Sequence, residues 1–273
     1  MSSTPEQVHG QRQGPEEQRM QGHWLLAKLG KRVLRPGGIE LTRRLIAAAK
    51  PTSTDRIVEF GPGVGRTASM LLACNPREYV GVDPNTEGTA ALNAILKKYD
   101  QARLVAADAK DTGLADASYD LVVGEAMLSM QTPKNKAAIA KEAFRILAPG
   151  GRYAIHELGI LPEDATDEQV AAISKSLSGS IRVGAKPLTT RLWTAFFEEA
   201  GFQVEYADHN PMHLLEPKRI ISDEGFVGAM RFFKNVATNP PARARIRQMR
   251  TNFREHRDNL QAVAFVAVKP RES

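Results

Sequence analysis

The residues of this sequence best suited to chemistry lie in one short segment, residues 57–66, which reads Ile-Val-Glu-Phe-Gly-Pro-Gly-Val-Gly-Arg. Gly61, Gly63 and Gly65 follow an apolar stretch that carries the carboxylate of Glu59. Glycine has no Cβ, so a ligand can lie directly against the backbone of such a turn and its amides. An anionic pyrophosphate would be repelled by Glu59, whereas a sulfonium and an ammonium group would be attracted. The segment therefore favours a ligand with cationic groups.

A second acidic residue indicates a cofactor that contains a ribose. Residues 63–68 also fit the G-x-G-x-x-A pattern of dinucleotide-binding loops, which by itself is a weak signal. Residues 78–83, Glu-Tyr-Val-Gly-Val-Asp, predict a second strand that ends in Asp83 about 20 residues after the glycines, where a carboxylate can hold a ribose diol. S-adenosylmethionine and nicotinamide dinucleotides both contain that ribose, and Glu59 favours the first. A turn residue at the strand end is the alternative interpretation of Asp83.

Further landmarks follow the glycine loop and Asp83 in a fixed order. They are residues 105–109 (Val-Ala-Ala-Asp-Ala), residues 118–125 (Ser-Tyr-Asp-Leu-Val-Val-Gly-Glu) and residues 145–155 (Arg-Ile-Leu-Ala-Pro-Gly-Gly-Arg-Tyr-Ala-Ile). Together these segments resemble the class I S-adenosylmethionine-dependent methyltransferase family, in particular its small-molecule branch, which includes the ubiquinone and menaquinone methyltransferases. The resemblance covers about residues 40–210 and the last predicted strand.

The resemblance implies a set of cofactor-binding residues at the ends of the predicted strands: Glu59, Gly61, Gly63, Gly65, Asp83, Pro84, Asp108, Ala109 and Glu125. The acid and glycines of the first turn would hold the methionine part of S-adenosylmethionine. The acid after the second strand would hold the ribose, and the pair after the third strand would hold the adenine. Residues 125–130 would lie beside the methyl group, with Met127 at the acceptor.

Methyl transfer from a sulfonium is an in-line displacement, so positioning and desolvation supply much of its rate and no protein nucleophile is required. An acceptor hydroxyl or acidic carbon would also need a base. The candidates are Glu125 after the fourth predicted strand and His156 or Glu157 after the fifth, because ligands of such sheets bind at the carboxyl ends of strands. Among these residue types, histidine is the one best suited to proton transfer near neutral pH, which favours His156. A histidine satisfied by hydrogen bonds at a strand end is an equally supported interpretation.

Strands alternate with helical patterns along the chain, which predicts an α/β fold with a doubly wound, seven-stranded, mostly parallel, Rossmann-like sheet. Two helices are expected before the first strand, separated by Arg35-Pro36-Gly37-Gly38. The predicted helices are 23–34, 39–49, 89–99, 134–147 and 190–200, and the last predicted strands are 202–206 and 260–268.

Two stretches are longer than crossovers require, and we expect helical insertions there to form a lid. In residues 158–188 a capping-box pattern precedes an apolar helical face. In residues 211–258 four apolar residues recur at helical spacing: Phe226, Val227, Met230 and Phe233. Packing against the core is the favoured interpretation of these four. The functional interpretation is that Phe226 and Met230 contact the acceptor.

Five arginines of the second insertion share one helical stripe: Arg243, Arg247, Arg250, Arg254 and Arg257. Such a face can bind an anionic substrate, a membrane surface or nucleic acid, although most charged stripes are merely solvated. The net charge of +6 favours anionic partners. The stripe has no interleaved aromatic residues for base stacking, so no nucleic acid is expected. The expected partner is a small-molecule methyl acceptor, and contact with a membrane surface stays open.

A chain of 273 residues can bury one sizeable core, and no apolar run reaches the roughly 20 residues that span a bilayer. Residues 1–20 are polar and lack a secretory pattern, so we expect a disordered tail, a single domain at 21–273 and a cytoplasmic location. A single cysteine, Cys74, excludes an internal disulfide, and no histidine spacing indicates a metal. The alternative functions are an NAD(P)-dependent oxidoreductase, disfavoured by Glu59, and a non-catalytic S-adenosylmethionine-binding protein.

Overall fold

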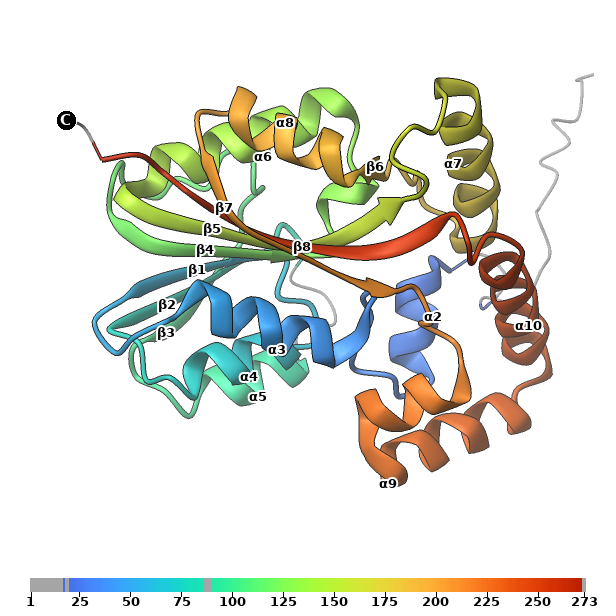
Figure 1. Ribbon diagram of the computed structural model, residues 1–273. Coiled ribbons are helices and arrows are strands. Elements are labelled where there is room, and N and C mark those ends of the chain that lie inside the picture. Colours follow the sequence, from blue (N-terminus) through green and yellow to red (C-terminus); the bar gives the residue numbers. More distant parts are fainter. Residues whose placement is uncertain (1–16, 18–19, 86–89, 272–273) are drawn as a thin grey trace, which may run out of the picture.

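A single twisted sheet forms the centre of the protein (Figure 1), whose computed structural model describes residues 17, 20–85 and 90–271. The strand order is β3-β2-β1-β4-β5-β8-β7, and a short strand, β6, pairs with β5. Strand β8 is antiparallel to both of its neighbours, and the other pairs are parallel. The strands are β1 Arg56–Phe60, β2 Glu78–Val82, β3 Ala102–Val105, β4 Tyr119–Glu125, β5 Leu147–Ile160, β6 Leu188–Thr189, β7 Gln203–Pro211 and β8 Leu260–Val268. The predicted α/β class and mostly parallel sheet are confirmed.

Helices cover both faces of the sheet (Figure 1). The helices α3 (Gly38–Ala49), α4 (Arg66–Leu72) and α5 (Ala90–Leu96) lie on one face, and α6 (Pro133–Ile146) and α8 (Thr190–Glu199) lie on the other. Successive side chains of a strand point to opposite faces. Phe60 accordingly joins the core that contains Trp193 of α8, whereas Ile57 joins the core that contains Leu41 of α3. The sheet is therefore buried on both sides.

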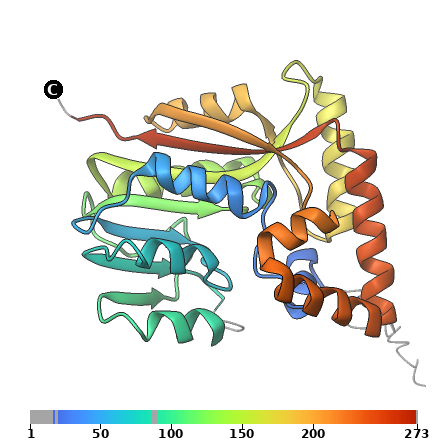
Figure 2. The same cartoon turned by 60° about the horizontal axis from the view of Figure 1, so that its bottom comes forward.

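A third hydrophobic core belongs to four helices at one end of the sheet, α2 (Gly22–Lys28), α7 (Asp167–Ile181), α9 (Pro217–Thr238) and α10 (Pro240–Glu255). We call them the four-helix group; Figure 2 shows them side by side. Leu25, Leu177, Phe232 and Met249 fill its interior, and Ile160 at the end of β5 joins them. The carboxyl end of β5 therefore meets this group.

Most predicted elements are present, with shifts that have local causes. The helix expected at 23–34 already ends at Lys28, and Gly30 follows with a left-handed φ of 97°. Strand β7 is longer than the predicted 202–206 because it pairs with β8 along its length. The capping box at the start of α7 is confirmed by reciprocal bonds between Thr166 and Gln169. The tail expected at residues 1–20 lies almost entirely outside the described residues.

Buried ion pairs fasten α9 to the loop between α2 and α3. Lys31 Nζ lies 3.0 Å from Asp223 Oδ2 and 3.6 Å from Glu224 Oε1, and all three side chains are fully buried. The amide of Arg32 donates to Glu224 Oε1 over 2.8 Å. Gly225 follows at once with non-helical angles, φ 71° and ψ 169°, and divides α9 into two segments. These ion pairs hold the first segment of α9, whereas the second segment is held by its buried residues Ala229 and Phe232.

Two phenylalanines of α9 provide a test of the separate core of the four-helix group. Phe232 is 1% exposed within that core, whereas Phe226 is 71% exposed. Phe232→Ala should lower the free energy of unfolding by about 3–5 kcal/mol, because it removes buried contacts and leaves a cavity. Phe226→Ala should change it by no more than about 0.5 kcal/mol. Urea unfolding measures both values, and equal values would contradict the assignment of Phe232 to the core.

Candidate active site

The glycine loop between β1 and α4 presents bare backbone to open space. Gly61, Gly63 and Gly65 all have left-handed φ angles, 65°, 53° and 80°. A Cβ placed on Gly61 would meet no atom within 4 Å, and one on Gly63 would meet only the Gly61 carbonyl oxygen at 3.9 Å. A Cβ on Gly65 would lie 2.7 Å from Ile95 Cδ1 of α5. The first two glycines therefore leave room for a ligand, and the third allows helix packing.

Glu59 lies in β1 directly before this loop and is 4% exposed. Tyr79 of the neighbouring strand β2 donates a hydrogen bond of 2.6 Å to Glu59 Oε2. Burial raises the pKa of Glu59 to about 8, although the Tyr79 hydrogen bond opposes the rise. The nearby carboxylate of Glu125 raises this pKa further, and the charge of Arg35 lowers it. Glu59 is thus a buried carboxyl group that is largely protonated at neutral pH and would be ionised by a bound cation.

Glu125, the last residue of β4, is a buried acceptor shared by several elements. Thr42 of α3 donates to its Oε1 over 2.6 Å, and His156 Nδ1 of β5 lies 2.9 Å from the same oxygen. Arg35 Nη1 lies 3.2 Å from Oε2, which also accepts a short hydrogen bond from Thr67 of α4. Burial raises the pKa of Glu125, but the charge of Arg35 and the bonds from His156 and Thr42 outweigh burial and lower it to about 2.

His156 is enclosed in this network. Its side chain is fully buried, and its Nδ1 also lies 3.3 Å from Thr42 Oγ1. Its Nε2 has no hydrogen-bond partner among the described residues. A Cβ on Gly37 would lie 3.0 Å from that nitrogen, so the backbone of Gly37 covers it. His156 is therefore satisfied on one side and shielded on the other.

Glu157, the third candidate base, accepts four hydrogen bonds, three from backbone amides and one from the Ser129 hydroxyl. Its Oε1 accepts hydrogen bonds from the amides of Met127 and Leu128, at 2.9 and 2.8 Å. Its Oε2 accepts from the amide and the hydroxyl of Ser129, at 2.9 and 2.6 Å. With four donors on a side chain that is 0% exposed, Glu157 holds the turn after β4. This arrangement does not suit the expected role of Glu157 as a base.

The acids after β2 and β3 lie at the same sheet edge as the glycine loop, because β1, β2 and β3 are neighbours. Asp83 is half-buried, and burial raises the pKa of its carboxyl group. Its Oδ1 accepts the amide of Asn85 over 2.9 Å. Pro84 is exposed, and so is Asp108, which pairs with Lys110 at 3.2 Å, whereas Ala109 is buried. The expected cofactor residues therefore follow one another along the strand ends.

The residues expected to contact the acceptor lie in two separate places, after β4 and on α9. Met127 is half-buried after β4, with its sulfur near Gly124. Phe226 and Met230 are 71% and 52% exposed on the outer side of α9, and Val227 is 73% exposed. The prediction that these three residues pack against the core is therefore wrong. Of the four residues, only Phe233 packs against buried neighbours. Exposed side chains do not enclose a ligand, so this arrangement does not support an acceptor pocket lined by Phe226 and Met230.

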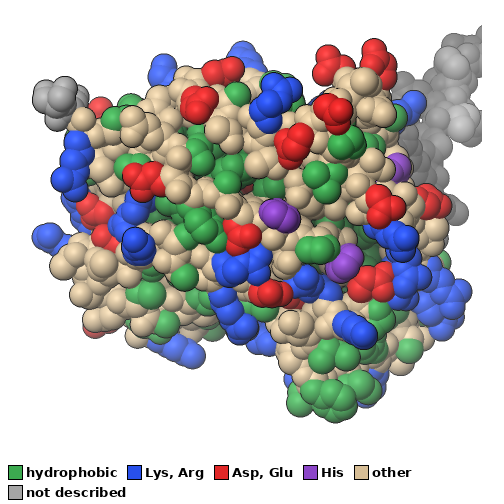
Figure 3. Space-filling view, in the orientation of Figure 1, with side chains coloured by type: hydrophobic (Ala, Val, Ile, Leu, Met, Phe, Trp, Pro, Cys, Tyr) green, Lys and Arg blue, Asp and Glu red, His purple; other side chains and the backbone are tan. Residues whose placement is uncertain are grey.

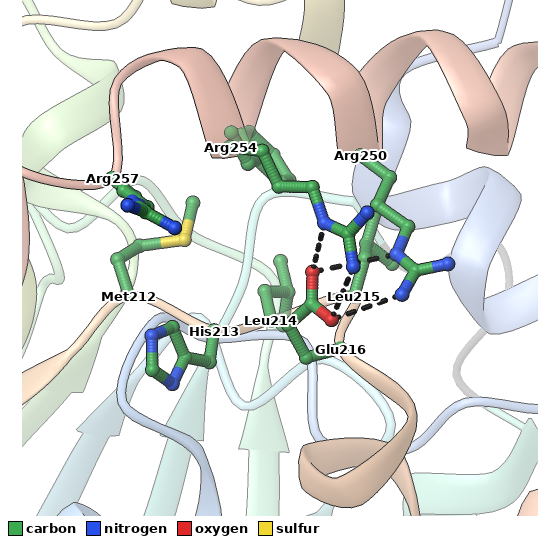
Figure 4. Close-up of a pocket in the computed structure, with 9 residues that line it drawn as sticks. Met212, His213, Leu214, Leu215, Glu216, Arg250, Arg254 and Arg257 are labelled. Carbon is green, nitrogen blue, oxygen red and sulfur yellow. Dashed lines mark hydrogen bonds and ion pairs between the residues drawn. The ribbon is translucent and has the colours of Figure 1, made fainter.

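A surface hollow of about 390 Å³ lies between α10 and the segment that joins β7 to α9 (Figure 4). In it Arg250 and Arg254 converge on Glu216, with shortest contacts of 2.9 and 2.6 Å. The hydrogen bonds from Arg254 and then Arg250 lower the pKa of Glu216 to about 2. Part of the arginine stripe predicted from the sequence is therefore paired internally, whereas Arg247 is exposed.

Sequence reasoning missed the donors that surround the two buried acids, namely Arg35, Thr42, Thr67 and Tyr79. Thr67 lies within the glycine pattern itself, so its position was a usable signal. Tyr79 precedes the glycine of the second strand and faces Glu59 only because β1 and β2 pair in register, with Glu59 opposite Gly81. Arg35 and Thr42 gave no signal, since only the tertiary fold brings them to β4.

Within residues 17, 20–85 and 90–271, no group of three or more His, Cys, Asp or Glu side chains is arranged to hold a metal ion. No helix in this part of the chain is both long enough and apolar enough to cross a bilayer.

Comparison with known proteins connects this geometry to a family. Residues 57–151 match a family model described as a methyltransferase domain. An uncharacterized protein of Haemophilus influenzae is 30% identical over 251 residues, which are 91% of this chain and 98% of that protein. The 27-O-demethylrifamycin SV methyltransferase of Amycolatopsis mediterranei is 26% identical over 175 residues, 62% of this chain and 61% of that enzyme.

Among solved structures, phosphoethanolamine N-methyltransferase 2 of Haemonchus contortus, in complex with S-adenosyl-L-methionine, superposes with a TM-score of 0.67 at 16% identity. The superposition covers 92% of this chain and 57% of that chain, and at this identity it supports the fold. Residues 57–151 therefore match a methyltransferase domain, and the family match and the fold together support a class I methyltransferase that uses S-adenosylmethionine.

The buried network around Glu125 predicts a specific loss of stability in acid. The folded pKa of about 2 is below the ordinary value of 4.5, so the ionised group stabilises the fold above pH 4.5 and that stabilisation is lost as the pH falls toward 2. Glu125→Gln should be strongly destabilised at pH 7, by about 3–5 kcal/mol, because it leaves Arg35 buried without its partner. The difference from wild type should shrink below pH 4.5.

The measurement is the free energy of unfolding in urea between pH 3 and pH 8. Asp258→Asn serves as a control, because that side chain is 88% exposed. A difference between Glu125→Gln and wild type that is constant across this range would contradict the proposed charge network.

Proposed function

We propose that this protein transfers a methyl group from S-adenosylmethionine to a small, partly hydrophobic acceptor. The observation that carries the proposal is the open backbone at Gly61 and Gly63 beside the buried carboxyl group of Glu59. A cationic ligand gains most from a carboxylate when little water competes for it. A cation would ionise Glu59 and pair with its charge, whereas an anionic pyrophosphate would gain no charge attraction from this acid, so the geometry supports S-adenosylmethionine over a nicotinamide dinucleotide.

The order of strand ends supports the proposed orientation of the cofactor. Strands β1, β2 and β3 are successive neighbours at one edge of the sheet, and adjacent strands lie about 4.8 Å apart. Glu59 with the glycine loop would hold the methionine part, Asp83 with Pro84 the ribose, and Asp108 with Ala109 the adenine. An extended molecule laid across these three strand ends meets the residues in that order. Glu125 would lie next to the methionine part, because its charge is close enough to raise the pKa of Glu59.

The bound cofactor supplies an electrophilic methyl group on a sulfonium. The protein would then act by alignment and by exclusion of water, which are large contributions for an in-line displacement. Glu125 is a weak base because its pKa is about 2, and Glu157 is occupied by four donors. His156 retains one unpaired nitrogen, covered by Gly37. We therefore assign positioning roles to Glu125 and Glu157, and we keep His156 as the candidate base, reachable when the loop at Gly37 moves.

The proposed acceptor class draws on the relatives and on the four-helix group. The name of the Amycolatopsis enzyme gives it a demethylrifamycin as acceptor, and the Haemonchus enzyme is named for phosphoethanolamine. Both are small molecules, and the resemblance to quinone methyltransferases favours a hydrophobic part. The four-helix group meets the carboxyl end of β5, so we propose that it forms the lid over the acceptor, with Met127 beneath it.

Calorimetric titration tests the choice of cofactor. S-adenosylhomocysteine should bind the wild type, and NADH should not. Asp83→Ala should weaken S-adenosylhomocysteine at least about tenfold, because hydrogen bonds from the ribose diol to a charged group are lost. Asp258→Ala, which removes an acid that is 88% exposed, is the matched control. Tight binding of NADH, or an unchanged affinity in a folded Asp83→Ala variant, would overturn the proposed cofactor site.

The raised pKa of Glu59 predicts that cofactor binding releases a proton. Below pH 8 the free protein holds a proton on Glu59, and a cation bound beside this group favours its ionised form. Affinity for S-adenosylmethionine should therefore rise with pH and level off near pH 8. Titrations at pH 7 in buffers of different ionisation enthalpy measure the release.

Glu59→Gln is the control for this proton, since the amide cannot ionise. The variant should show no linked release and a lower affinity. A wild type whose binding releases no proton near pH 7 would separate Glu59 from the cationic part of the cofactor.

A further inference from the structure

Helix α9 carries a cluster of exposed apolar side chains beyond its kink. Phe226, Val227 and Met230 are 71%, 73% and 52% exposed, and Ile221, one turn before the kink, is 43% exposed. We call these four residues the α9 patch. Figure 3 shows hydrophobic side chains gathered at the lower edge of the molecule, where α9 lies. Large apolar side chains that gather on a surface mark an interaction site more often than singly exposed ones do.

The fold itself creates this patch. The opposite side of α9 supplies Phe232 and Ala229 to the core of the four-helix group. The backbone kink at Gly225 comes directly before Phe226. One face of the second segment is therefore buried, and its other face exposes Phe226, Val227 and Met230. Figure 2 shows α9 at the edge of the molecule.

The charges that accompany the patch are positive. The acids of α9 are Asp223 and Glu224, and both are buried in ion pairs with Lys31. The exposed charged residues of the same helix are cations: Lys218, Arg231 and Lys234. The neighbouring α10 adds the exposed residues Arg243 and Arg247. The surface around the α9 patch is therefore complementary to an anionic partner.

We propose that the α9 patch docks on the surface of an anionic lipid bilayer. Apolar side chains that protrude between cations suit the boundary between headgroups and acyl chains, where burial and charge attraction act together. A stable protein interface uses roughly 20 residues per partner, many more than these four. Single-stranded nucleic acid would require aromatic stacking platforms, and the patch contains one aromatic residue and three aliphatic side chains.

This surface gives the lid a further role, which rests on the proposed function. A partly hydrophobic acceptor dissolves in a bilayer, and the four-helix group that would cover the acceptor also carries the α9 patch. Docking would bring the lid to the bilayer in which the acceptor is dissolved. The bilayer contact itself does not depend on methyl transfer and is tested separately.

Vesicle sedimentation tests the contact. The full chain is mixed with vesicles of phosphatidylcholine alone or with about 30% phosphatidylglycerol. The wild type should bind the anionic vesicles at least about tenfold more tightly than the neutral ones, and about 0.5 M salt should weaken that binding. Phe226→Ser with Val227→Ser should reduce binding at least about tenfold, because the apolar contact is lost. Lys218→Glu with Lys234→Glu should also weaken it.

Leu192→Ser is the matched control, since Leu192 is 37% exposed on α8, away from the four-helix group. It should bind vesicles as the wild type does. Failure of the wild type to bind anionic vesicles, or unchanged binding by the Phe226 and Val227 double variant, would overturn the proposal. The proposal would also be overturned if light scattering showed that the wild type is a dimer and the double variant a monomer, because the patch would then be a self-association surface.

Titration with S-adenosylhomocysteine separates this inference from the proposed function. The double variant should keep its affinity within about twofold, because the patch lies outside the cofactor site. A wild type that binds vesicles but not S-adenosylhomocysteine would retain the bilayer contact and remove the proposed methyl transfer. The reverse result would leave the methyltransferase assignment and remove the docking surface.

Discussion

The buried carboxylate of Glu125 is the interaction on which the rest of the site depends. It accepts hydrogen bonds or charge from Arg35, Thr42, Thr67 and His156. These partners come from the loop before α3, from α3, from α4 and from β5, so one side chain joins four parts of the chain at the end of β4. A buried charge is tolerated only when such partners replace its water. Glu125 therefore links α4, which follows the glycine loop, and the loop before α3 to the end of β4.

Two acids in this region have opposite protonation because their partners differ. Glu125 receives several donors and the charge of Arg35, which lower its pKa to about 2. Glu59 has one hydroxyl donor and a nearby carboxylate, and burial raises its pKa to about 8. Neighbouring carboxyl groups with separated pKa values assume different roles. Here the ionised Glu125 holds several elements together. The protonated Glu59 can become negatively charged when a cation binds beside the open backbone of the glycine loop.

Within the four-helix group, α9 carries buried ion pairs before its kink and exposed apolar side chains after it. Asp223 and Glu224 fix the start of α9 through Lys31, in a cluster that excludes water. Beyond Gly225 the helix turns its apolar residues outward, among cations. Glu216 similarly pairs with Arg250 and Arg254 in the C-terminal half of α10, which removes one of their two positive charges. The fold therefore pairs some of these arginines with an acid, and the positive charge that remains at the surface is smaller than the arginine stripe suggests.

The sequence alone determined the α/β class, the strand that precedes the glycine loop and the cofactor, S-adenosylmethionine. It could do so because apolar alternation and glycine spacing are patterns that extend over a few residues. It also placed Glu59, Asp83 and Asp108 at strand ends. Only the tertiary structure decided which donors surround each acid, that Glu157 holds a turn, and that Phe226 and Met230 face outward. Burial and hydrogen-bond partners depend on contacts between residues far apart in the chain, and these contacts fix the pKa values. Local patterns contain no record of such contacts, so the electrostatics of the site emerged only from the fold.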